Sequence, residues 1–320
     1  MKRILLITSV LPWPLRKNGG AQRTALMKRA LEAFGHVDIF AVGGLALRDE
    51  ADAAFDQRLR EQNVIAALVR QSPPLTPPIY LPGPFGKLWK TVRAYQGAYE
   101  ADPAVAAELD RVMRENKYDL IVSRYLQPAM QAGVERYPGI PKLLDFDDID
   151  WSTLATAMEE KPWPGLGGKI GSKMVLKTVR QACDGAMHLF GGVFVTSEED
   201  RSLLTCDPIV LPNIPYSDSG TTLPALPPDD GSRELLFVGD LQFPPNRDGL
   251  DHFLSRVWPG VTKAVAAATI TIVGRGLTED RRARWANVPG VNVVGFAPDV
   301  AECYRRCAMS VVPIYTGGGT

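Results

Sequence analysis

Short apolar segments alternate with longer amphipathic ones along most of the chain. The segment RILLITSV near the N-terminus is apolar with little interruption, which is typical of a strand buried on both faces of a sheet. Similar short runs predict further strands at VDIFAV, VIAALV, YDLIVS, KLLDF, GVFVTS, LLFVGD, TITIVG, VNVVGF and MSVVPI. Because helical sequence lies between these runs, the pattern predicts parallel sheets with helices on both faces.

Apolar residues at helical spacing mark the connecting helices. The helix after the first strand has an apolar stripe made of Leu26, Met27, Ala30, Leu31 and Phe34. The helix after LLFVGD has apolar residues at Leu250, Phe253, Leu254, Val257 and Trp258. A polar stretch at 49–62 and the segment VAECYRRCA predict two more helices.

The composition changes between Val210 and Arg233. This segment, LPNIPYSDSGTTLPALPPDDGS, is rich in Pro, Ser, Asp and Gly and has no apolar period, which is typical of a linker. We therefore expect an α/β protein with two Rossmann-like domains in tandem, at 1–210 and 233–320, joined by a linker at 211–232. A second Pro-rich segment at 72–86 is too short for a domain linker and predicts a surface loop.

The sequence ends at GGGT, directly after a predicted strand. A parallel sheet needs a crossover connection and a further strand at this point. The predicted second domain is also much shorter than the first. We expect from this that the second domain is incomplete at its C-terminus.

Charge and composition narrow the functional classes. The 36 Lys and Arg balance 36 Asp and Glu, so the net charge gives no general attraction to nucleic acid or membranes. The longest apolar run, RILLITSVLPWPL, contains two prolines, is too short to span a membrane and lacks the order of a signal peptide. Four cysteines do not make a disulfide framework. We expect a cytoplasmic protein that has no nucleic-acid partner.

Glycines follow four of the predicted strands, at the sheet edge where open α/β sheets bind ligands. They are Gly19 and Gly20, then Gly239, then Gly274 and Gly276 on either side of Arg275, and finally Gly317, Gly318 and Gly319. Glycine lets a backbone approach a phosphate, although after a strand it is most often part of a turn. The first loop lacks G-x-G-x-x-G and the chain lacks a P-loop motif, which argues against dinucleotide-binding and P-loop folds.

The segment LLDFDDIDW carries four carboxylates, Asp145, Asp147, Asp148 and Asp150. Carboxylate oxygens bind divalent metal ions. The same pattern arises where a strand end caps the next helix, and Asp148 or Asp150 suits that role. We favour the cap and expect no metal site, because backbone amides and arginines can neutralise a phosphate instead.

Other candidate chemistry is sparse. The three histidines have no partner at metal-ligand spacing, and Cys303 and Cys307 have no second pair of ligands nearby, so packing is the simpler role for both cysteines. We assign no catalytic residue.

One predicted helix has a basic side. Its cations fall at i, i+4, i+8 and i+11 and alternate with Ile170, Met174 and Val175; they are Lys169, Lys173, Lys177 and Arg180. A basic amphipathic helix can lie on an anionic membrane surface. The more common origin of such a row is a solvated face on a helix that packs against the core.

Several motifs in order resemble the family 4 glycosyltransferases of GT-B fold. They are GGA, VTSEEDRSLL, VLPNIP, FVGDLQFPPNRDGLDHF, IVGRGL, VVGFAPDV and SVVPIYTGGGT. The chain is similar in particular to the bacterial members that build exopolysaccharide and other surface glycans. The resemblance is most specific from Leu235 to Thr320 and loosest between Asp49 and Asp119.

This resemblance implies transfer of a sugar from a nucleotide diphosphate sugar donor to a glycan or lipid-linked acceptor. It also implies retention of configuration, no bound metal and no other cofactor. The N-terminal domain would take the acceptor and the C-terminal domain the donor. Peripheral contact with the inner membrane face would suit a lipid-linked acceptor.

Site roles follow from the same resemblance. Gly19 and Gly20 would face the donor diphosphate, and Gly317, Gly318 and Gly319 would begin a loop toward it. The nucleotide base would lie near the remaining candidates, which are Gly274, Arg275, Gly276, Phe296 and Ala297. Gly239, Asn246 and Arg247 would contact phosphate.

The sequence departs from the family pattern in two places. Many members carry an Arg and a Lys that hold the diphosphate where this chain has Asp240 and Asn246, so Arg247 is the nearest cation. The family's paired glutamates lie just beyond the GGGT stretch, where the sequence ends. We expect the donor site to be incomplete and the chain as given to be inactive. A nucleotide-sugar epimerase of the same fold and a non-catalytic donor-binding scaffold are the alternatives.

Overall fold

The structure is a computed structural model of the chain. It describes residues 2–12, 19–42, 64–67, 86–160, 162–214, 231–297 and 300–314. The chain forms two compact units, Met1–Asp218 with Gly318–Thr320 (unit 1) and Ser219–Gly317 (unit 2). The predicted helix at 49–62, nearly all of the predicted loop at 72–86 and most of the predicted linker lie outside the described residues.

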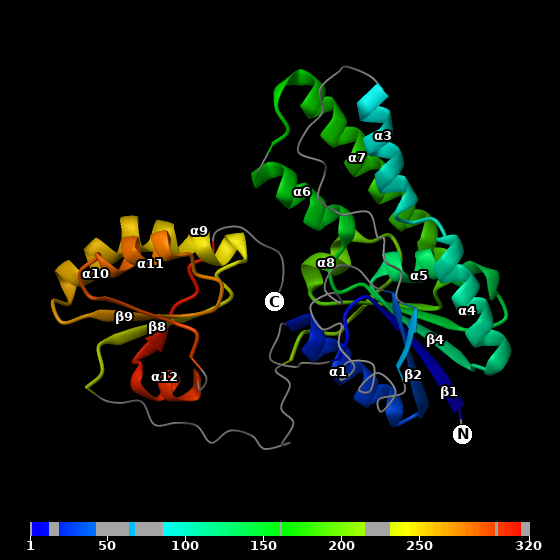
Figure 1. The fold of residues 1–320 in the computed structure, drawn as a ribbon, viewed down its shortest axis with the longest axis horizontal. Coiled ribbons are helices and arrows are strands. Elements are labelled where there is room, and N and C mark those ends of the chain that lie inside the picture. The colour runs from blue at the N-terminus through cyan, green and yellow to red at the C-terminus, as the bar shows by residue number, and fades with distance from the viewer. Residues whose placement is uncertain are drawn as a thin grey trace. The chain divides into compact units, whose positions relative to one another are not determined.

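The described part of unit 1 contains a parallel sheet in the order β3-β2-β1-β4-β5-β6-β7 (Figure 1). Its strands are β1 (Lys2–Thr8), β2 (Gly35–Val42), β3 (Val64–Ala67), β4 (Leu120–Arg124), β5 (Lys142–Asp145), β6 (Gly192–Val195) and β7 (Ile209–Val210). The strand order reverses between β1 and β4. In a doubly wound sheet, this reversal is the switch point outside which ligands bind.

Helices cover both faces of this sheet. They are α1 (Gly19–Glu32), α3 (Gly86–Gly97), α4 (Pro103–Glu115), α5 (Leu126–Ala132), α6 (Asp150–Glu160), α7 (Gly165–Ala186) and α8 (Glu198–Leu203), with 3-10 turns at Val134–Arg136 and Met187–Leu189. Figure 1 shows α1 on one face and α4 and α5 on the other. Leu5 and Ile7 therefore belong to one core cluster, and Ile4 and Leu6 belong to another. Because β1 is covered on both faces, all four consecutive positions are apolar.

Two details of unit 1 differ from the sequence predictions. The predicted apolar stripe of α1 ends early, because the helix stops at Glu32 and Phe34 is 73% exposed. Met27 and Leu31 do pack on the core, but the buried helix positions also include the polar Arg23. Strand β7 has two residues and no apolar run of its own, so the sequence pattern did not predict it.

Helices α3, α6 and α7 extend beyond the sheet as a group (Figure 1). The buried seam of α7 consists of Gly171, Val175, Val179, Cys183 and Ala186. Val175 was predicted to alternate with the cations on the basic side, and it lies in the core instead. The seam explains why α7 stays attached to the core along its length.

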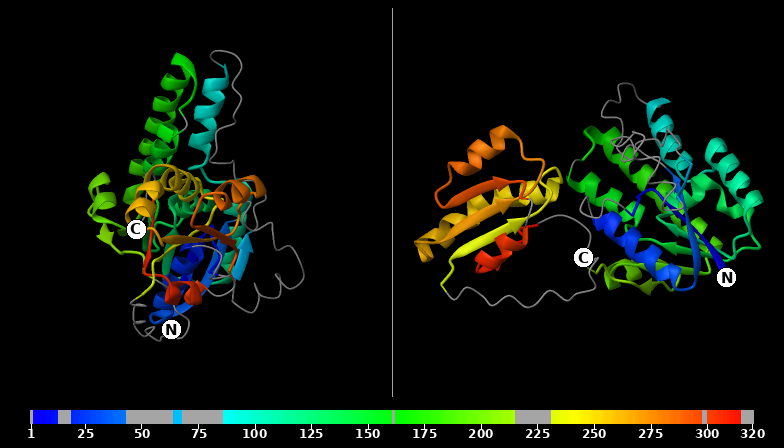
Figure 2. Two further views of the ribbon diagram at one scale, coloured as in Figure 1. Left: turned by 90° about the vertical axis from the view of Figure 1, so that its left-hand side faces the viewer. Right: turned by 60° about the horizontal axis from the view of Figure 1, so that its bottom comes forward.

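Unit 2 contains a smaller parallel sheet in the order β10-β9-β8-β11. Its strands are β8 (Glu234–Val238), β9 (Thr269–Val273), β10 (Val291–Gly295) and β11 (Met309–Ser310). Its helices are α9 (Pro244–His252), α10 (Trp258–Ala264), α11 (Glu279–Ala286) and α12 (Val300–Arg306). Figures 1 and 2 show α9, α10 and α11 on one face of the sheet and α12 on the other.

The helix predicted after β8 is interrupted. A π-helical turn, Phe253–Val257, separates α9 from α10. The wider turn shifts the helical phase, so Val257 is 38% exposed rather than on the apolar face as predicted. Phe253, Leu254 and Trp258 keep their predicted places in the core.

Candidate functional site

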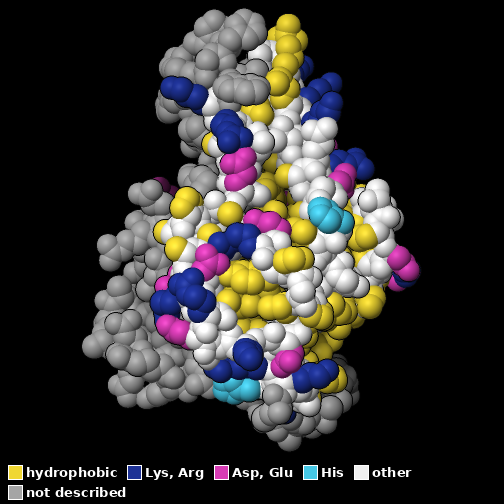
Figure 3. Space-filling view, turned by 90° about the vertical axis from the view of Figure 1, so that its right-hand side faces the viewer, with side chains coloured by type: hydrophobic (Ala, Val, Ile, Leu, Met, Phe, Trp, Pro, Cys, Tyr) yellow, Lys and Arg dark blue, Asp and Glu magenta, His cyan; other side chains and the backbone are white. Residues whose placement is uncertain are grey.

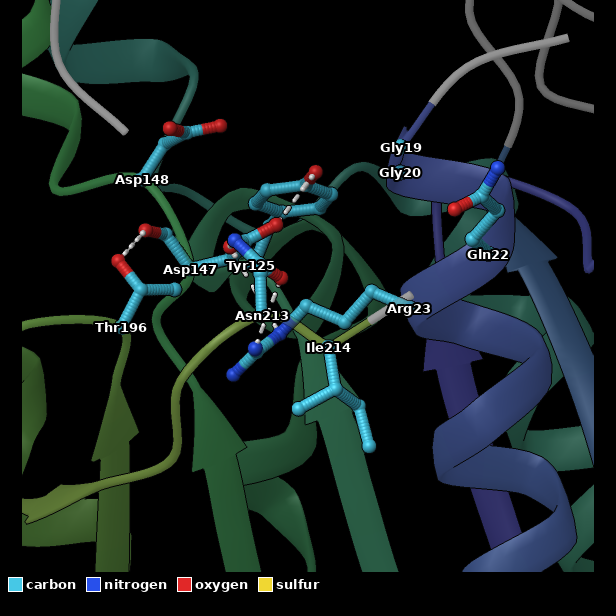
Figure 4. Close-up of a pocket in the computed structure, with 10 residues that line it drawn as sticks. All are labelled: Gly19, Gly20, Gln22, Arg23, Tyr125, Asp147, Asp148, Thr196, Asn213 and Ile214. Atoms are coloured by element: carbon cyan, nitrogen blue, oxygen red, sulfur yellow. Dashed lines mark hydrogen bonds and ion pairs between the residues drawn. The ribbon is translucent and has the colours of Figure 1, made fainter. Parts of the chain in front are cut away.

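A pocket lies at the switch point of the unit 1 sheet, beyond the carboxyl ends of the parallel strands (Figure 4). We call it the switch-point pocket. Its volume is about 270 Å³, and it is lined by Gly19, Gly20, Gln22, Arg23, Tyr125, Asp147, Asp148, Thr196, Asn213 and Ile214. These residues come from α1 and from the segments that follow β4, β5, β6 and β7. Residues nearly 200 positions apart in sequence therefore meet at one sheet edge.

Arg23 holds one wall of the pocket in place. Its Nε and Nη2 donate hydrogen bonds to the two carboxylate oxygens of Asp145, at 2.9 and 2.5 Å. Its Nη1 donates to the carbonyl oxygen of Leu211 and to Oδ1 of Asn213. The Arg23 side chain is 7% exposed and that of Asp145 is fully buried. This guanidinium therefore ties α1 to β5 and to the residues after β7.

A second buried arginine, Arg124, ends strand β4. Its Nη1 donates to the carbonyl oxygen of Gly20 and to Oγ1 of Thr24, and its Nη2 bonds the carboxylate of Asp147. Its Nε lies 3.4 Å from Oδ2 of Asp145 and makes no hydrogen bond with the described residues. The two arginines thus neutralise Asp145 and Asp147 in a buried cluster.

The other two carboxylates of the acidic segment behave differently. Asp150 is the first residue of α6, and it accepts a hydrogen bond of 2.7 Å from the hydroxyl of Tyr99. Burial raises the pKa of Asp150 to about 6. Among the described residues, Asp148 makes no hydrogen bond or ion pair, and desolvation together with the charge of Asp147 raises its pKa.

These contacts correct the predicted helix cap. The Asp150 carboxylate is bonded to Tyr99, and Asp148 caps nothing among the described residues. The carbonyl oxygen of Ile149 accepts the amides of Ser152 and Thr153 in the first turn of α6. Within the described ranges, no group of three or more His, Cys, Asp and Glu residues is arranged to hold a metal ion.

Tyr125 has an unusual backbone. Its φ of 69° and ψ of 150° lie in a region that glycine adopts and other residues rarely do. The guanidinium of Arg124 lies over its ring at 4.6 Å, and Nη2 of Arg124 donates to its hydroxyl. The strained backbone therefore directs an aromatic ring into the pocket immediately after β4.

At the carboxyl edge of the unit 2 sheet, three of the predicted glycines lie close together. A Cβ at Gly274 would lie 2.0 Å from the carbonyl oxygen of Gly239, so the chain after β9 tolerates no side chain at this position. Gly276 has a φ of +80°, and a Cβ there would meet Gln242 at 2.1 Å. Gly295, at the end of β10, also has a positive φ, although it was not among the glycines predicted to lie at the site.

The other unit 2 candidates have identifiable neighbours. Asn246 donates to the carbonyl oxygen of Asp240, whose carboxylate pairs with Arg275 at 2.9 Å. Arg247 pairs with Asp248 at 2.9 Å. Phe296 is 74% exposed, whereas Ala297 packs on the core. Gly317, Gly318 and Gly319 lie outside the described residues.

In unit 1 the structure places Gly19 and Gly20 in the pocket, at the start of α1. The sequence analysis missed Arg23, Arg124, Tyr125, Thr196 and Asn213. Their local sequence gives little signal, because each is an ordinary polar residue next to a helix or strand end. Gly19, Gly20 and the acidic segment were the visible signals, and the pairing of that segment with arginines depends on the strand order.

The sequence of unit 2 matches a known family. Residues 232–320 match the model of a family described as glycosyl transferases group 1. The structure of sucrose-phosphate synthase from Thermosynechococcus elongatus is similar over 98% of this chain and 76% of that chain, with 16% identity and a TM-score of 0.54. The chain has the GT-B fold.

Other GT-B comparisons are weaker. The glycosyltransferase SnogD from Streptomyces nogalater aligns over 97% of this chain and 75% of that chain, with 17% identity, but its TM-score is 0.41. No curated protein matches the sequence significantly. Among the described helices, none is both long and apolar enough to cross a membrane.

Proposed function

We propose that this protein is a glycosyltransferase that moves a sugar from a nucleoside diphosphate sugar to a glycan or lipid-linked acceptor in the synthesis of surface polysaccharide. The match of residues 232–320 to glycosyl transferases group 1 carries the proposal. We assign the donor to unit 2 and the acceptor to unit 1. The reaction retains the anomeric configuration and uses no bound metal or other cofactor.

The donor site that we propose in unit 2 consists largely of main-chain groups. The close approach of Gly239 to Gly274 and the positive φ of Gly276 leave main chain, rather than side chains, at the ends of β8 and β9. Backbone amides in such positions are preorganised donors for the charge that develops on a leaving diphosphate. We also propose that Gly317–Gly319 contact the phosphates and that Phe296 and Ala297 flank the base.

Arg247 is the cation that we assign to the diphosphate. Its present partner, Asp248, is 60% exposed at the side chain, and an exposed ion pair of this kind is weak enough to exchange for a phosphate. A charge-assisted hydrogen bond to phosphate contributes about 1.5–3 kcal/mol. Asn246 stays bonded to the backbone and shapes the turn.

Calorimetric titration with uridine, guanosine and adenosine diphosphate sugars, followed by NMR analysis of products, tests the proposal. We expect one donor to bind and, where it is consumed, to be hydrolysed or transferred with retention, also after chelation of metals. Inversion at C2 of the sugar would identify an epimerase, and failure of every donor to bind would contradict the proposal.

A variant tests the role of Arg247. Arg247→Ala should weaken binding of the nucleoside diphosphate about 10-fold to 150-fold while leaving binding of the nucleoside unchanged. Arg256, an exposed arginine on the π-helical turn, provides the matched control Arg256→Ala. Equal weakening of both ligands would show that Arg247 does not contact phosphate.

We further propose that the protein is cytoplasmic and that α7 contacts the inner membrane surface. Lys169, Lys173 and Lys177 are exposed and form no ion pair with described residues. Arg180 differs, because it lies 3.7 Å from Asp184 and its guanidinium covers the ring of Trp151 at 4.7 Å. The predicted row of four cations is thus reduced to three lysines that have no ion-pair partner in the part of the chain that the structure describes.

Apolar side chains accompany these lysines on the exposed side of α7. Leu166 is 76% exposed, Ile170 49% and Met174 38%. Figure 3 shows hydrophobic side chains beside Lys and Arg at the upper end of unit 1. A helix surface that combines cations with exposed apolar groups complements an anionic lipid headgroup region.

Vesicle sedimentation tests this contact. Each lysine near an anionic surface contributes about 1 kcal/mol, so replacing all three with Gln should weaken binding to phosphatidylglycerol vesicles by about 100-fold. Lys117→Gln and Lys263→Gln together are the control, since both lysines are exposed and lie outside α7. Unchanged binding in the triple variant would exclude α7 as the contact.

A further inference from the structure

The switch-point pocket has a size and position that suit a small ligand. Its volume of about 270 Å³ lies near the lower end of small-molecule sites. It opens at the reversal of strand order between β1 and β4, which is where open parallel sheets bind ligands. One sugar ring is a ligand of suitable size for this space.

Arg23, which lines the pocket, and the neighbouring Arg124 are both bonded to protein groups already. The three guanidinium nitrogens of Arg23 are bonded to Asp145, Leu211 and Asn213. Both terminal nitrogens of Arg124 are bonded as well, to groups that include Asp147. A phosphate or carboxylate ligand would have to break these buried bonds to reach either cation.

Two polar side chains of the lining are left for a ligand, a carboxylate and an amide. Among the described residues, neither the Asp148 carboxylate nor the Gln22 amide has a hydrogen-bond partner. Figure 4 shows them at opposite sides of the pocket with the ring of Tyr125 between them. A carboxylate accepts hydrogen bonds and an amide both donates and accepts, which is the combination that hydroxyl groups satisfy.

The charge of the pocket favours a neutral ligand. Asp145 and Asp147 balance Arg23 and Arg124, so Asp148 leaves an excess of negative charge among the described residues. Like charges placed together oppose binding, and a uronate or a sugar phosphate would meet this carboxylate. A neutral sugar would not.

We propose that the switch-point pocket binds one uncharged sugar residue, with Asp148 accepting hydrogen bonds from its hydroxyls, Gln22 contacting the opposite edge and the Tyr125 ring packing on its apolar face. An aromatic ring presents an apolar surface that suits the C–H face of a sugar. The inference rests on the proposed function in one respect, since this sugar would be the terminal residue of the acceptor. It specifies that residue as neutral.

Saturation-transfer NMR on the full chain tests the pocket. The probes are the methyl glycosides of glucose, galactose, mannose and N-acetylglucosamine, with glucuronic acid and glucose 6-phosphate as charged counterparts. We expect at least one neutral glycoside to bind at least tenfold more tightly than either anion. Equal or tighter binding of an anion, or no binding of any neutral glycoside, would overturn the proposal.

Two variants assign the binding to this pocket. Asp148→Ala should weaken binding of the glycoside at least tenfold. Asp148→Asn removes the charge but keeps the shape, so it should also reduce the preference of the pocket for the neutral glycoside over glucuronic acid. Glu159→Gln is the control, because Glu159 is an exposed carboxylate with no partner among the described residues. If the Asp148 variants bind like the control, then the site lies elsewhere and the proposal is wrong.

The outcome separates this inference from the proposed function. If no nucleoside diphosphate sugar binds but a neutral glycoside does, then the glycosyltransferase proposal fails and the pocket proposal stands. If a donor binds and is consumed but the Asp148 variants do not affect glycoside binding, then the pocket proposal fails and the glycosyltransferase proposal stands.

Discussion

Replacing Asp145 with Asn tests the buried charge cluster of unit 1. The carboxylate is fully buried and holds Arg23 through two hydrogen bonds, and it lies 3.4 Å from Nε of Arg124. An Asn side chain has nearly the same shape, but its NH₂ group cannot accept a hydrogen bond from a guanidinium. Asp145→Asn would therefore leave two buried cations opposite a single remaining partner, Asp147.

The expected cost follows from that burial. Removing one partner of a buried ion pair destabilises a fold by about 3–5 kcal/mol, because the remaining charge stays desolvated. The exposed pair between Arg93 and Glu100 provides the control, since its side chains are 55% and 47% exposed. Glu100→Gln should cost less than about 1 kcal/mol.

Peptide-resolved hydrogen exchange measures both effects in the intact protein. The slowest amides of β1, β4 and β5 should exchange about 100-fold to 4,000-fold faster in Asp145→Asn, while β8 and β9 of unit 2 stay unchanged. An acceleration no larger than that of Glu100→Gln would refute the reasoning, because it would mean that the cluster does not depend on the negative charge.

Three further predictions concern glycine, pH and thiols. Gly274→Ala should lower the stability of unit 2 toward urea by more than about 1 kcal/mol, because its Cβ would overlap a carbonyl oxygen. Gly260→Ala is the control: there is open space around Gly260, so this change should raise the stability of unit 2 by about 0.4–1 kcal/mol. Because burial raises the pKa of Asp150 to about 6, the folded state disfavours its ionised form, and stability is lost as the pH rises from about 4 to about 6. The free energy of unfolding in urea should therefore be higher in Asp150→Asn than in the original chain by up to about 3 kcal/mol at pH 8, and equal to it at pH 4. A maleimide should label Cys206 at pH 8 and spare Cys183, whose side chain is buried and whose pKa is raised by that burial. Mass spectrometry of peptides measures the labelling, and equal labelling of the two cysteines would contradict the prediction.

The strands were predictable because their signal is local. An uninterrupted apolar run such as that of β1 has few explanations other than a strand covered on both faces, and the structure confirms it for that strand. Local patterns failed where the backbone departs from a regular helix. The π-helical turn before Trp258 changes which residues face the core, and no apolar period reveals such a turn in advance.

The switch-point pocket was less predictable because its parts are joined only by the tertiary fold. Arg23 looks like a surface residue of an amphipathic helix, and it is buried because Asp145, which lies 122 positions later, meets it at the sheet edge. The carboxylates were visible in the sequence, but which of them would be neutralised depends on the order of β4, β5 and β6. Tyr125 gave no signal, since nothing in the sequence marks a non-glycine residue that will adopt a positive φ.

The hydrogen bonds of Arg23 determine where unit 1 can be cut for separate expression. A fragment that ends at residue 210 would contain all the described strands of the unit 1 sheet and would still lose both acceptors of Nη1, the carbonyl oxygen of Leu211 and Oδ1 of Asn213. An unsatisfied donor at a 7% exposed side chain costs about 1–3 kcal/mol. A fragment that extends through Ile214 keeps these bonds, so four residues without regular secondary structure decide whether the isolated unit retains its pocket wall.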